Sequence, residues 1–300
     1  MHHIVESFSE TAVFPYRVRS AGLSDGGEST VLNEKRIAVA LPTYNAETTL
    51  RQTLMEIDRN TVAHILWVDD GSTDGTVTEA NRLGLYIIRH ELNLGYGAHQ
   101  DACYFEALKR GADIIIMRRP DYQYTTRLPS AMARMILYGT HDAVVAAHVL
   151  RKIPLKEGIP LYKYVFNLTL TLTENRMIAL KLSEYHSGYR EFARSVLDSV
   201  PFDQNSHDFI FDNRMIGQVL TSGFQLAEIS GPMQYDRYFS SITFRPSVIY
   251  GLGMLETALQ FRLARWNLDV PSYLNLIMHK SMTQSPSPES LTYNKQAWVY

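Results

Sequence analysis

Short apolar runs alternate with longer segments of helical periodicity between residues 36 and 147. The apolar runs lie at residues 36–41, 64–68, 85–89, 113–117 and 142–147, and helical segments at 47–59, 74–83, 97–110 and 127–138 separate them. Strands joined by helices of this length form βαβ units, in which the strands are parallel and buried on both faces. The sequence therefore predicts an α/β domain, Rossmann-like, with a mainly parallel central sheet flanked by helices.

The strict alternation fades after about residue 150. A long helical pattern at 160–180, a loop at 183–190, a helix near 209–223, two short strands at 224–235 and an amphipathic stretch at 248–266 follow. We expect an N-terminal extension (1–34), a core domain (35–240), a C-terminal helical segment (241–280) and a flexible tail (281–300). The amphipathic stretch is typical of a helix packed on its own domain, and a membrane-surface or homodimer helix stays open.

Composition excludes several classes of partner. The 29 basic and 31 acidic residues give a net charge of −2, so no general field attracts nucleic acid. The single cysteine, Cys103, cannot form an internal disulfide, and no run of 18 uncharged apolar residues predicts a membrane span. We expect a cytoplasmic protein, either soluble or peripheral to the inner face of the membrane.

Polar residues gather where the predicted strands end, which is where parallel sheets bind ligands. The ends read Pro-Thr-Tyr-Asn at 42–45, Asp-Asp at 69–70, Asn-Leu-Gly-Tyr-Gly at 93–97 and Arg-Arg-Pro-Asp at 118–121. Helix capping accounts for one acid after the second strand. Two adjacent carboxylates repel each other unless a ligand donor or a cation compensates. The pair Asp69 and Asp70 therefore indicates either a cap or a ligand site.

Taken together, these strand ends resemble the family 2 glycosyltransferases of the GT-A fold. The shared patterns are Pro-x-Tyr-Asn-x-Glu at 42–47, Asp-Asp-Gly-Ser-x-Asp at 69–74 and Asn-x-Gly-x-Gly at 93–97, and the resemblance covers roughly residues 36–240. It implies a nucleotide-sugar donor. The residues expected to hold that donor in these loops are Pro42, Tyr44, Asn45, Glu47, Asp69, Asp70 and Gly95.

The resemblance also implies a divalent cation after the central strand. There the family carries an Asp-x-Asp motif for Mg²⁺ or Mn²⁺, hard cations that prefer oxygen ligands. This chain keeps Asp121 and Gln123 at the family spacing, but Arg119 replaces the first Asp. We expect a cation on Asp121 and Gln123 with Arg119 turned aside. Partial replacement of the cation by Arg119, whose guanidinium matches phosphate oxygens, and a site without turnover remain alternatives.

A later segment resembles the polyprenyl-phosphate and dolichyl-phosphate sugar synthases. Residues 184–190 follow the acidic-x-x-Ser/Thr-Gly-aromatic-Arg pattern of those enzymes. The acceptor-side candidates it implies are Glu184, His186, Ser187 and Gly188. Arg190 is implied as a catalytic phosphate clamp, with a solvated surface arginine as the alternative. Arg237, in a loop that follows, is a further candidate phosphate ligand.

Two acids in the second half could serve as a general base. Asp208 and Asp212 are four residues apart, a spacing that places both carboxylates on one face of a helix. Transfer to a hydroxyl acceptor needs a base, whereas a phosphate acceptor is already ionised. Asp208 is the candidate base, and helix capping or ion pairing is the alternative.

These features together predict an inverting glycosyltransferase. It would move a sugar from a UDP-linked or GDP-linked donor to an acceptor, with polyprenyl phosphate as the leading acceptor. A soluble hydroxyl acceptor and a non-catalytic nucleotide-sugar-binding protein remain open. A nucleotidyltransferase is disfavoured, because residues 41–54 contain neither the glycine nor the lysine of a phosphate loop.

Overall fold

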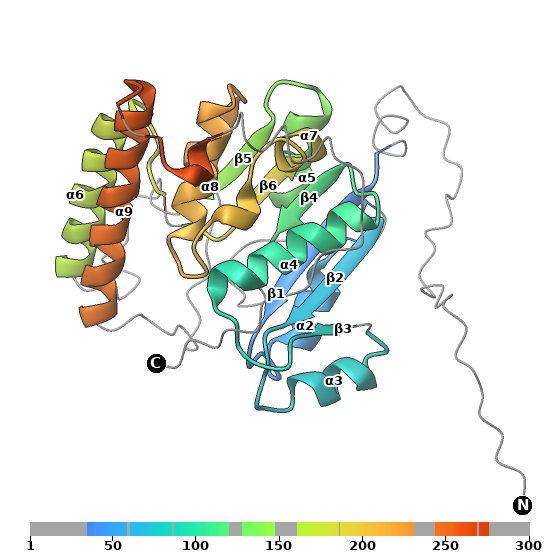
Figure 1. Cartoon of the computed structure of the whole chain (residues 1–300). Helices are drawn as coiled ribbons and strands as arrows, with labels where there is room; N and C mark the ends of the chain where they lie inside the picture. The colour runs from blue at the N-terminus through green and yellow to red at the C-terminus, as the bar shows by residue number, and fades with distance from the viewer. Residues whose placement is uncertain are drawn as a thin grey trace, which may run out of the picture.

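A computed structural model describes residues 35–58, 61–85, 87–119, 128–147, 161–185, 187–230, 244–268 and 270–275. Within these residues a seven-stranded sheet carries helices on both of its faces (Figure 1). The strands are β1 (Ile37–Thr43), β2 (His64–Asp69), β3 (Ile87–Arg89), β4 (Ile114–Met117), β5 (Ala143–Ala147), β6 (Arg190–Ala193) and β7 (Leu226–Ser230). The predicted α/β class is confirmed.

The strand order is β3-β2-β1-β4-β6-β5-β7. β1 pairs in parallel with β2 and β4, β5 pairs in parallel with β7, and β6 runs antiparallel to both of its neighbours. The chain winds outward from β1 to β3 and then crosses to β4 on the other side. The strand order thus reverses between β1 and β4, and sheets of this kind bind ligands beyond the carboxyl ends of the strands at such a point.

The helices are α2 (Leu50–Glu56), α3 (Thr76–Arg82), α4 (Tyr96–Lys109), α5 (Leu128–Leu137), α6 (Leu161–Ile178), α7 (Arg194–Leu197), α8 (Phe211–Thr221) and α9 (Phe244–Arg265). Several starts differ from the prediction, and two of them bear on the candidate site. α2 begins at Leu50 rather than at residue 47, because the preceding loop turns through Asn45 with φ at +49°. α8 begins at Phe211, and this leaves Asp208 outside the helix.

Side-chain size on β1 sets how the helices approach the sheet. Val39 and Leu41 point to the cluster that also contains Leu50 of α2 and Met132 of α5. Ala38 and Ala40 point to the other face of the sheet, into a second cluster that contains Tyr104 of α4. Their small side chains let α4 lie close against the strand. The packing fixes the N-terminus of α4 beside the strand ends.

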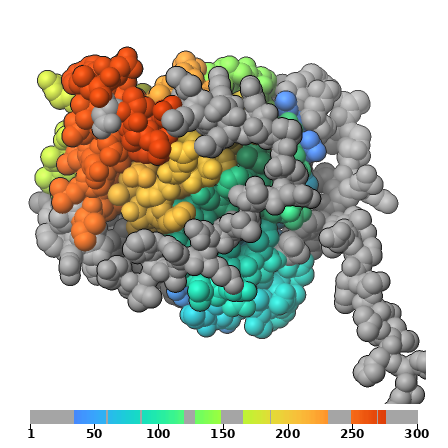
Figure 2. Space-filling view, viewed as in Figure 1, coloured from blue at the N-terminus to red at the C-terminus, as the bar shows by residue number. Residues whose placement is uncertain are grey.

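α6 and α9 lie side by side at one end of the molecule (Figure 1). Their facing sides bury Leu170, Met254 and Phe261 in a third cluster that also includes Ile216 of α8. The space-filling view places α9 along an outer edge (Figure 2). A helix, α9, thus covers most of the expected stretch 248–266, and one side of it packs on α6 and α8. No helix among the described residues is both long and apolar enough to cross a bilayer.

Candidate active site

The loops after β1 and β2 are tied to each other by side chains. The backbone N–H of Asn45 donates to Ser72 Oγ at 2.8 Å, and Asn45 Oδ1 accepts from the Thr73 N–H at 2.9 Å. The Glu47 carboxylate accepts from the Gly75 N–H at 3.1 Å. Asn45 and Glu47 therefore shape this edge, and their contact with a nucleotide stays a prediction. Pro42 is buried within β1, while Tyr44 is 48% exposed at the strand end, where its ring could stack on a base.

Asp69 is fully buried at the end of β2. Its Oδ2 accepts from the Ser72 N–H at 3.1 Å and lies 3.5 Å from Nε of Arg89. Its Oδ1 has no hydrogen-bond partner among the described residues. A buried carboxylate oxygen left without a donor is costly, and a donor from a bound ligand would remove that cost.

Asp70 holds the loop between β3 and α4. Its Oδ1 lies 2.8 Å from Nδ1 of His90 and accepts from the Leu94 N–H at 3.0 Å, and its Oδ2 accepts from the Gly95 N–H at 3.2 Å. Burial acts to raise the pKa of Asp70, but the hydrogen bonds from His90 and Leu94 outweigh burial and lower it. Asp70 is therefore ionised at neutral pH and places the start of α4 next to β2.

A buried polar network joins α4 to α8 through Asp212. Tyr96 Oη donates to Asp212 Oδ2 at 2.8 Å, and Gln100 Nε2 donates to Asp212 Oδ1 at 2.9 Å. Arg190 of β6 completes the network, with Nε 3.6 Å from Asp212 Oδ1. Neither Tyr96 nor Gln100 was predicted as a site residue, because Tyr96 and Asp212 are 116 residues apart in the sequence.

Arg190 is 1% exposed. Its guanidinium donates to the carbonyl oxygens of Tyr185, Ser187 and Asp212, each at 2.8 Å. The alternative of a solvated surface arginine is therefore wrong. The predicted phosphate clamp is untested, but these bonds give Arg190 a clear positioning role, since they fix the 184–190 segment against α8.

Asp208 and Asp212 do not share a helix face, contrary to expectation. Asp208 precedes α8 and is exposed, and its Oδ1 accepts from Ser206 Oγ at 2.7 Å and from the Ile210 N–H at 2.8 Å. Asp212 is 3% exposed. The i,i+4 argument failed because the helix starts three residues after Asp208. Asp208 as a base stays a prediction. Its carboxylate bonds to the N–H of Ile210, the N-cap residue of α8, and no side chain caps the helix itself.

The acceptor-side segment is anchored to β7. The backbone N–H groups of Ser183 and Glu184 donate to the Glu228 carboxylate, at 2.9 and 3.2 Å. Ser187 is buried and its Oγ accepts from the Tyr189 N–H at 3.2 Å, and Gly188 lies against Tyr96. The predicted residues His186, Asp121, Gln123 and Arg237 lie outside the described residues. Their roles remain predictions.

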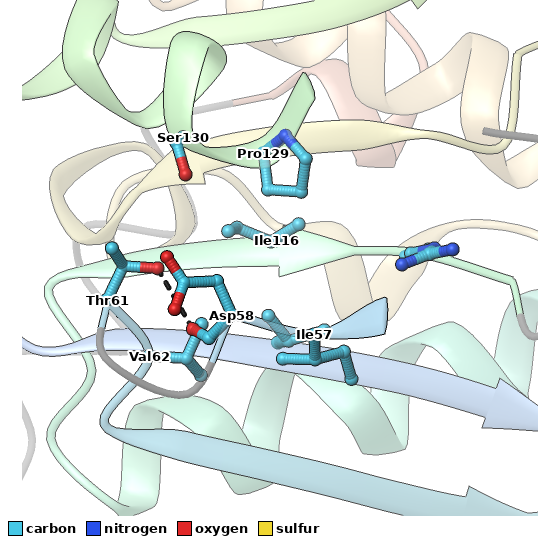
Figure 3. A pocket seen from close by; sticks show the side chains of 9 residues that line it. Ile57, Asp58, Thr61, Val62, Ile116, Pro129 and Ser130 are labelled. Atoms are coloured by element: carbon cyan, nitrogen blue, oxygen red, sulfur yellow. Dashed lines mark hydrogen bonds between the residues drawn. The ribbon is translucent and has the colours of Figure 1, made fainter. Parts of the chain in front are cut away.

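The two arginines after β4 turn to opposite faces of the sheet. Arg118 is 2% exposed and donates to Glu56 of α2 at 2.5 Å. A pocket on that face, lined by Arg118, Ile57, Thr61 and Pro129 among others, shares no residue with the predicted site (Figure 3). Arg119 is exposed on the α4 side, with its guanidinium carbon 5.9 Å from the centre of the Tyr96 ring.

A buried carboxyl that sequence patterns did not single out lies next to this network. Glu174 of α6 is fully buried, and its Oε1 accepts from Asn213 Nδ2 at 2.7 Å. Burial raises the pKa of Glu174 to about 8, against smaller opposing effects of Asn213 and Arg190. The helical pattern of residues 160–180 predicted the helix, but a single glutamate in it carries no signal of burial.

The chain is similar to known glycosyltransferases. The model of "Glycosyl transferase family 2" matches residues 38–200. The chain is 25% identical to the polyprenol monophosphomannose synthase of Mycolicibacterium smegmatis, over 80% of this chain and 90% of the relative. It is also 25% identical to the UDP-N-acetylglucosamine–dolichyl-phosphate N-acetylglucosaminyltransferase of Methanococcus voltae, over 55% and 72%.

A solved structure shares the fold. Glucosyl-3-phosphoglycerate synthase from Mycobacterium tuberculosis, in complex with Mn²⁺, UDP-glucose and phosphoglyceric acid, superposes with a TM-score of 0.57 at 16% identity, covering 81% of this chain and 83% of that one. The strand order and this likeness show that the chain has the GT-A fold. The chain belongs to glycosyltransferase family 2, and it is a nucleotide-sugar glycosyltransferase.

Proposed function

We propose that the chain transfers a sugar from a UDP-linked or GDP-linked donor to polyprenyl phosphate, with inversion at the anomeric carbon. This choice of acceptor rests on one observation: the carboxylates of both candidate bases already accept hydrogen bonds from neighbouring residues. Asp212 already accepts from Tyr96 and Gln100 beside Arg190, and Asp208 already accepts from Ser206 and Ile210. An ionised phosphate acceptor needs no base, so it suits this arrangement better than a hydroxyl does.

The relatives support the same acceptor class. Two of them are named for transfer to polyprenol or dolichyl phosphate. In the proposed reaction an acceptor phosphate oxygen attacks the anomeric carbon while the bond to the donor's β-phosphate oxygen breaks. The electron pair leaves with the nucleoside diphosphate, and the configuration inverts. Positive groups near the leaving phosphate stabilise the transition state.

The donor's nucleoside is assigned to the ends of β1 and β2. Asp69 Oδ1 lacks a hydrogen-bond partner among the described residues, so it is the proposed acceptor for a base or ribose donor. Tyr44 is exposed beside it as a stacking surface. Asp121 and Gln123 are the residues that would hold a divalent cation, which when bound would neutralise the diphosphate. The Mn²⁺ in the solved neighbour supports such a cation in general terms.

The proposal predicts nucleoside diphosphate release that depends on lipid phosphate. Purified protein is incubated with UDP- and GDP-linked hexoses and N-acetylhexosamines, with either detergent-dispersed polyprenyl phosphate or free polyprenol, and release is measured by a coupled assay. We expect at least 10-fold faster release with polyprenyl phosphate, and a glycolipid product that mild acid cleaves. Equal rates with free polyprenol would contradict the phosphate acceptor. Release of nucleoside diphosphate only with soluble hydroxyl acceptors would show instead that the enzyme transfers the sugar to a soluble hydroxyl group.

We further propose that the outer face of α6 and α9 contacts the membrane that holds the acceptor. The large apolar side chains exposed on this face are Val165, Phe166, Leu168, Leu172, Ile249, Leu252 and Leu259. α9 also reaches the site, because the Tyr250 ring lies 6.1 Å from that of Phe209, which packs on Tyr96 at 4.8 Å. An apolar face next to the acceptor side suits a lipid substrate.

Replacing Leu252 and Leu259 together with Glu is expected to lower binding to phospholipid vesicles by 10-fold or more. Burial of each leucine is worth about 1.5–3 kcal/mol, and the new charges resist insertion. Vesicle sedimentation measures the effect, and Met55→Glu, an exposed apolar site on α2, is the matched control. Unchanged sedimentation of the double variant would contradict membrane contact. Loss of a dimer in size-exclusion chromatography instead would assign the face to a second copy.

A further inference from the structure

The first turn of α4 points a histidine at the ends of two strands. α4 packs against β1 and β2 (Figure 1), and His99, in that first turn, is 5% exposed. Its Nε2 lies 2.5 Å from the carbonyl oxygen of Val68 in β2, and the backbone nitrogen of Thr43 in β1 lies 3.2 Å from the same Nε2. One side chain thus contacts the backbones of two neighbouring strands near their carboxyl ends.

The imidazole nitrogen lies at one of the last rungs of the β1–β2 ladder. Thr43 is paired with Asp69, and the N–H of Asp70 donates to the carbonyl oxygen of Thr43 at 3.0 Å. In a parallel pair of this register the N–H of Thr43 points toward the carbonyl oxygen of Val68. Nε2 of His99 lies within hydrogen-bond distance of both groups. The ring therefore helps to set how far apart the two strands end.

His99 is a neutral imidazole at neutral pH. Burial lowers its pKa, and the smaller opposing effects of the Val68 carbonyl and of Asp70 do not outweigh burial. In a neutral ring Nε2 carries either a hydrogen or a lone pair, so it either donates to the Val68 oxygen or accepts from the Thr43 N–H. The shorter of the two distances, 2.5 Å to the Val68 oxygen, favours the form with hydrogen on Nε2. His99 thus acts on the strand backbones rather than as a charge.

The residues that follow these two contacts are the ones assigned to the nucleoside. Tyr44, next to Thr43, is 48% exposed, and Asp69, next to Val68, is buried with an Oδ1 that lacks a hydrogen-bond partner among the described residues. A peptide unit is planar, so a fixed Val68 carbonyl also fixes the backbone nitrogen of Asp69. A nucleoside that stacks on Tyr44 and donates to Asp69 needs these two groups at one separation.

We infer that His99 is a positioning residue for the donor nucleoside, because it holds the ends of β1 and β2 at the separation that Tyr44 and Asp69 need to bind the nucleoside together. The inference rests on the proposed function, which assigns the nucleoside to these two strand ends. A misplacement of about 1 Å in such a site can cost roughly 100-fold. His99 has this effect through the strand backbones, without contacting the nucleotide.

Calorimetric titration of UDP and GDP into the full chain and its variants, with Mn²⁺ present, tests this inference. For the nucleotide that binds, His99→Leu is expected to weaken binding by roughly 10-fold or more, because it leaves the Thr43 N–H and the Val68 carbonyl without the imidazole. His99→Gln is expected to bind within about 3-fold of the wild type, since its amide has a separate donor and acceptor at nearly the reach of Nε2.

Two further measurements separate positioning from general stability. Leu274→Ala is the matched control, because Leu274 is buried in the third cluster, which packs between α6, α8 and α9, and its truncation leaves a cavity. It is expected to lower the melting temperature and yet to keep nucleotide binding within about 3-fold of the wild type. Hydrogen–deuterium exchange is expected to be faster at the ends of β1 and β2 in His99→Leu than in His99→Gln. If His99→Leu does not fold, His99→Asn replaces it, because its shorter amide stops short of the position of Nε2.

The outcomes separate this inference from the proposed function. Unchanged nucleotide binding by folded His99→Leu, while Asp69→Ala loses it, would overturn the inference and leave the nucleoside at these strand ends. Equal weakening of binding by Leu274→Ala would also overturn it, since His99 would then act only through overall stability. Absence of nucleotide binding by the folded wild type would overturn the placement of the nucleoside and the inference with it. Weaker binding in His99→Leu that His99→Gln restores would support the inference. The titration contains no acceptor, so its result does not depend on polyprenyl phosphate being the acceptor.

Discussion

Arg190→Met is expected to lower the free energy of unfolding by about 3–5 kcal/mol. The variant removes three hydrogen bonds to the carbonyl oxygens of Tyr185, Ser187 and Asp212, and it leaves the Asp212 carboxylate buried without its cation. In a chain of this size such a loss corresponds to a fall in melting temperature of roughly 10 °C. Thermal and urea unfolding, followed by circular dichroism, measure it.

Arg82→Met is the matched control, because Arg82 is two-thirds exposed and pairs with Glu79 at the surface. Its loss should change the free energy of unfolding far less than the loss of Arg190 does, because solvent screens a surface ion pair. The alternative role of Arg190, a phosphate clamp, makes a different prediction. If Arg190→Met kept wild-type stability and lost only nucleotide or acceptor binding, the positioning role would be wrong.

Glu174→Gln is expected to stabilise the protein at alkaline pH. The pKa of Glu174 is raised to about 8 by burial, from an ordinary value of 4.5. The folded state therefore keeps a proton that the unfolded state releases, and stability from this group is present below pH 4.5 and lost as pH rises toward and through 8. Above pH 8 the free energy of unfolding is lower by up to about 5 kcal/mol because of this group. Glutamine avoids it, while its carbonyl oxygen still accepts from Asn213.

The measurement is the difference in unfolding free energy between wild type and Glu174→Gln from pH 5 to pH 9. The partly buried Asp101 and the buried Glu191 also have raised pKa values, and taking the difference between the two proteins cancels their effect. Glu256→Gln, at an exposed position on α9, is the control. A difference that grows by several kcal/mol with pH supports a protonated, buried Glu174. A difference that stays flat across the range would contradict it.

The parallel part of the sheet could be predicted because both of its faces are buried. β1, β2, β4 and β5 read as continuous apolar runs, and helices of regular periodicity separate them. β6 was missed, and its first residue was assigned to a loop. It has four residues, Arg-Glu-Phe-Ala, two of them charged and buried. Only its place between β4 and β5 makes this segment a strand.

The candidate site was predicted only in part. Acidic and glycine-rich strand ends identify the loops, since their chemistry is local to a few residues. The contacts among these loops depend on how distant elements meet, as with Tyr96 and Asp212. The expectation that Asp208 and Asp212 share a helix face failed for a related reason, because α8 begins three residues after Asp208. Arg118 and Arg119 look alike in sequence, yet they lie on opposite faces of the sheet.

The central claim is that a nucleotide binds at the ends of β1 and β2, and calorimetric titration tests it most directly. UDP, GDP and their sugar derivatives are titrated into wild-type protein and into Asp69→Ala, which removes the buried carboxylate whose Oδ1 lacks a hydrogen-bond donor among the described residues. We predict that one base is bound clearly more tightly than the other, and that Asp69→Ala weakens its binding at least 10-fold. Absence of binding by every nucleotide to folded wild-type protein, or equal binding by a folded Asp69→Ala, would contradict the account.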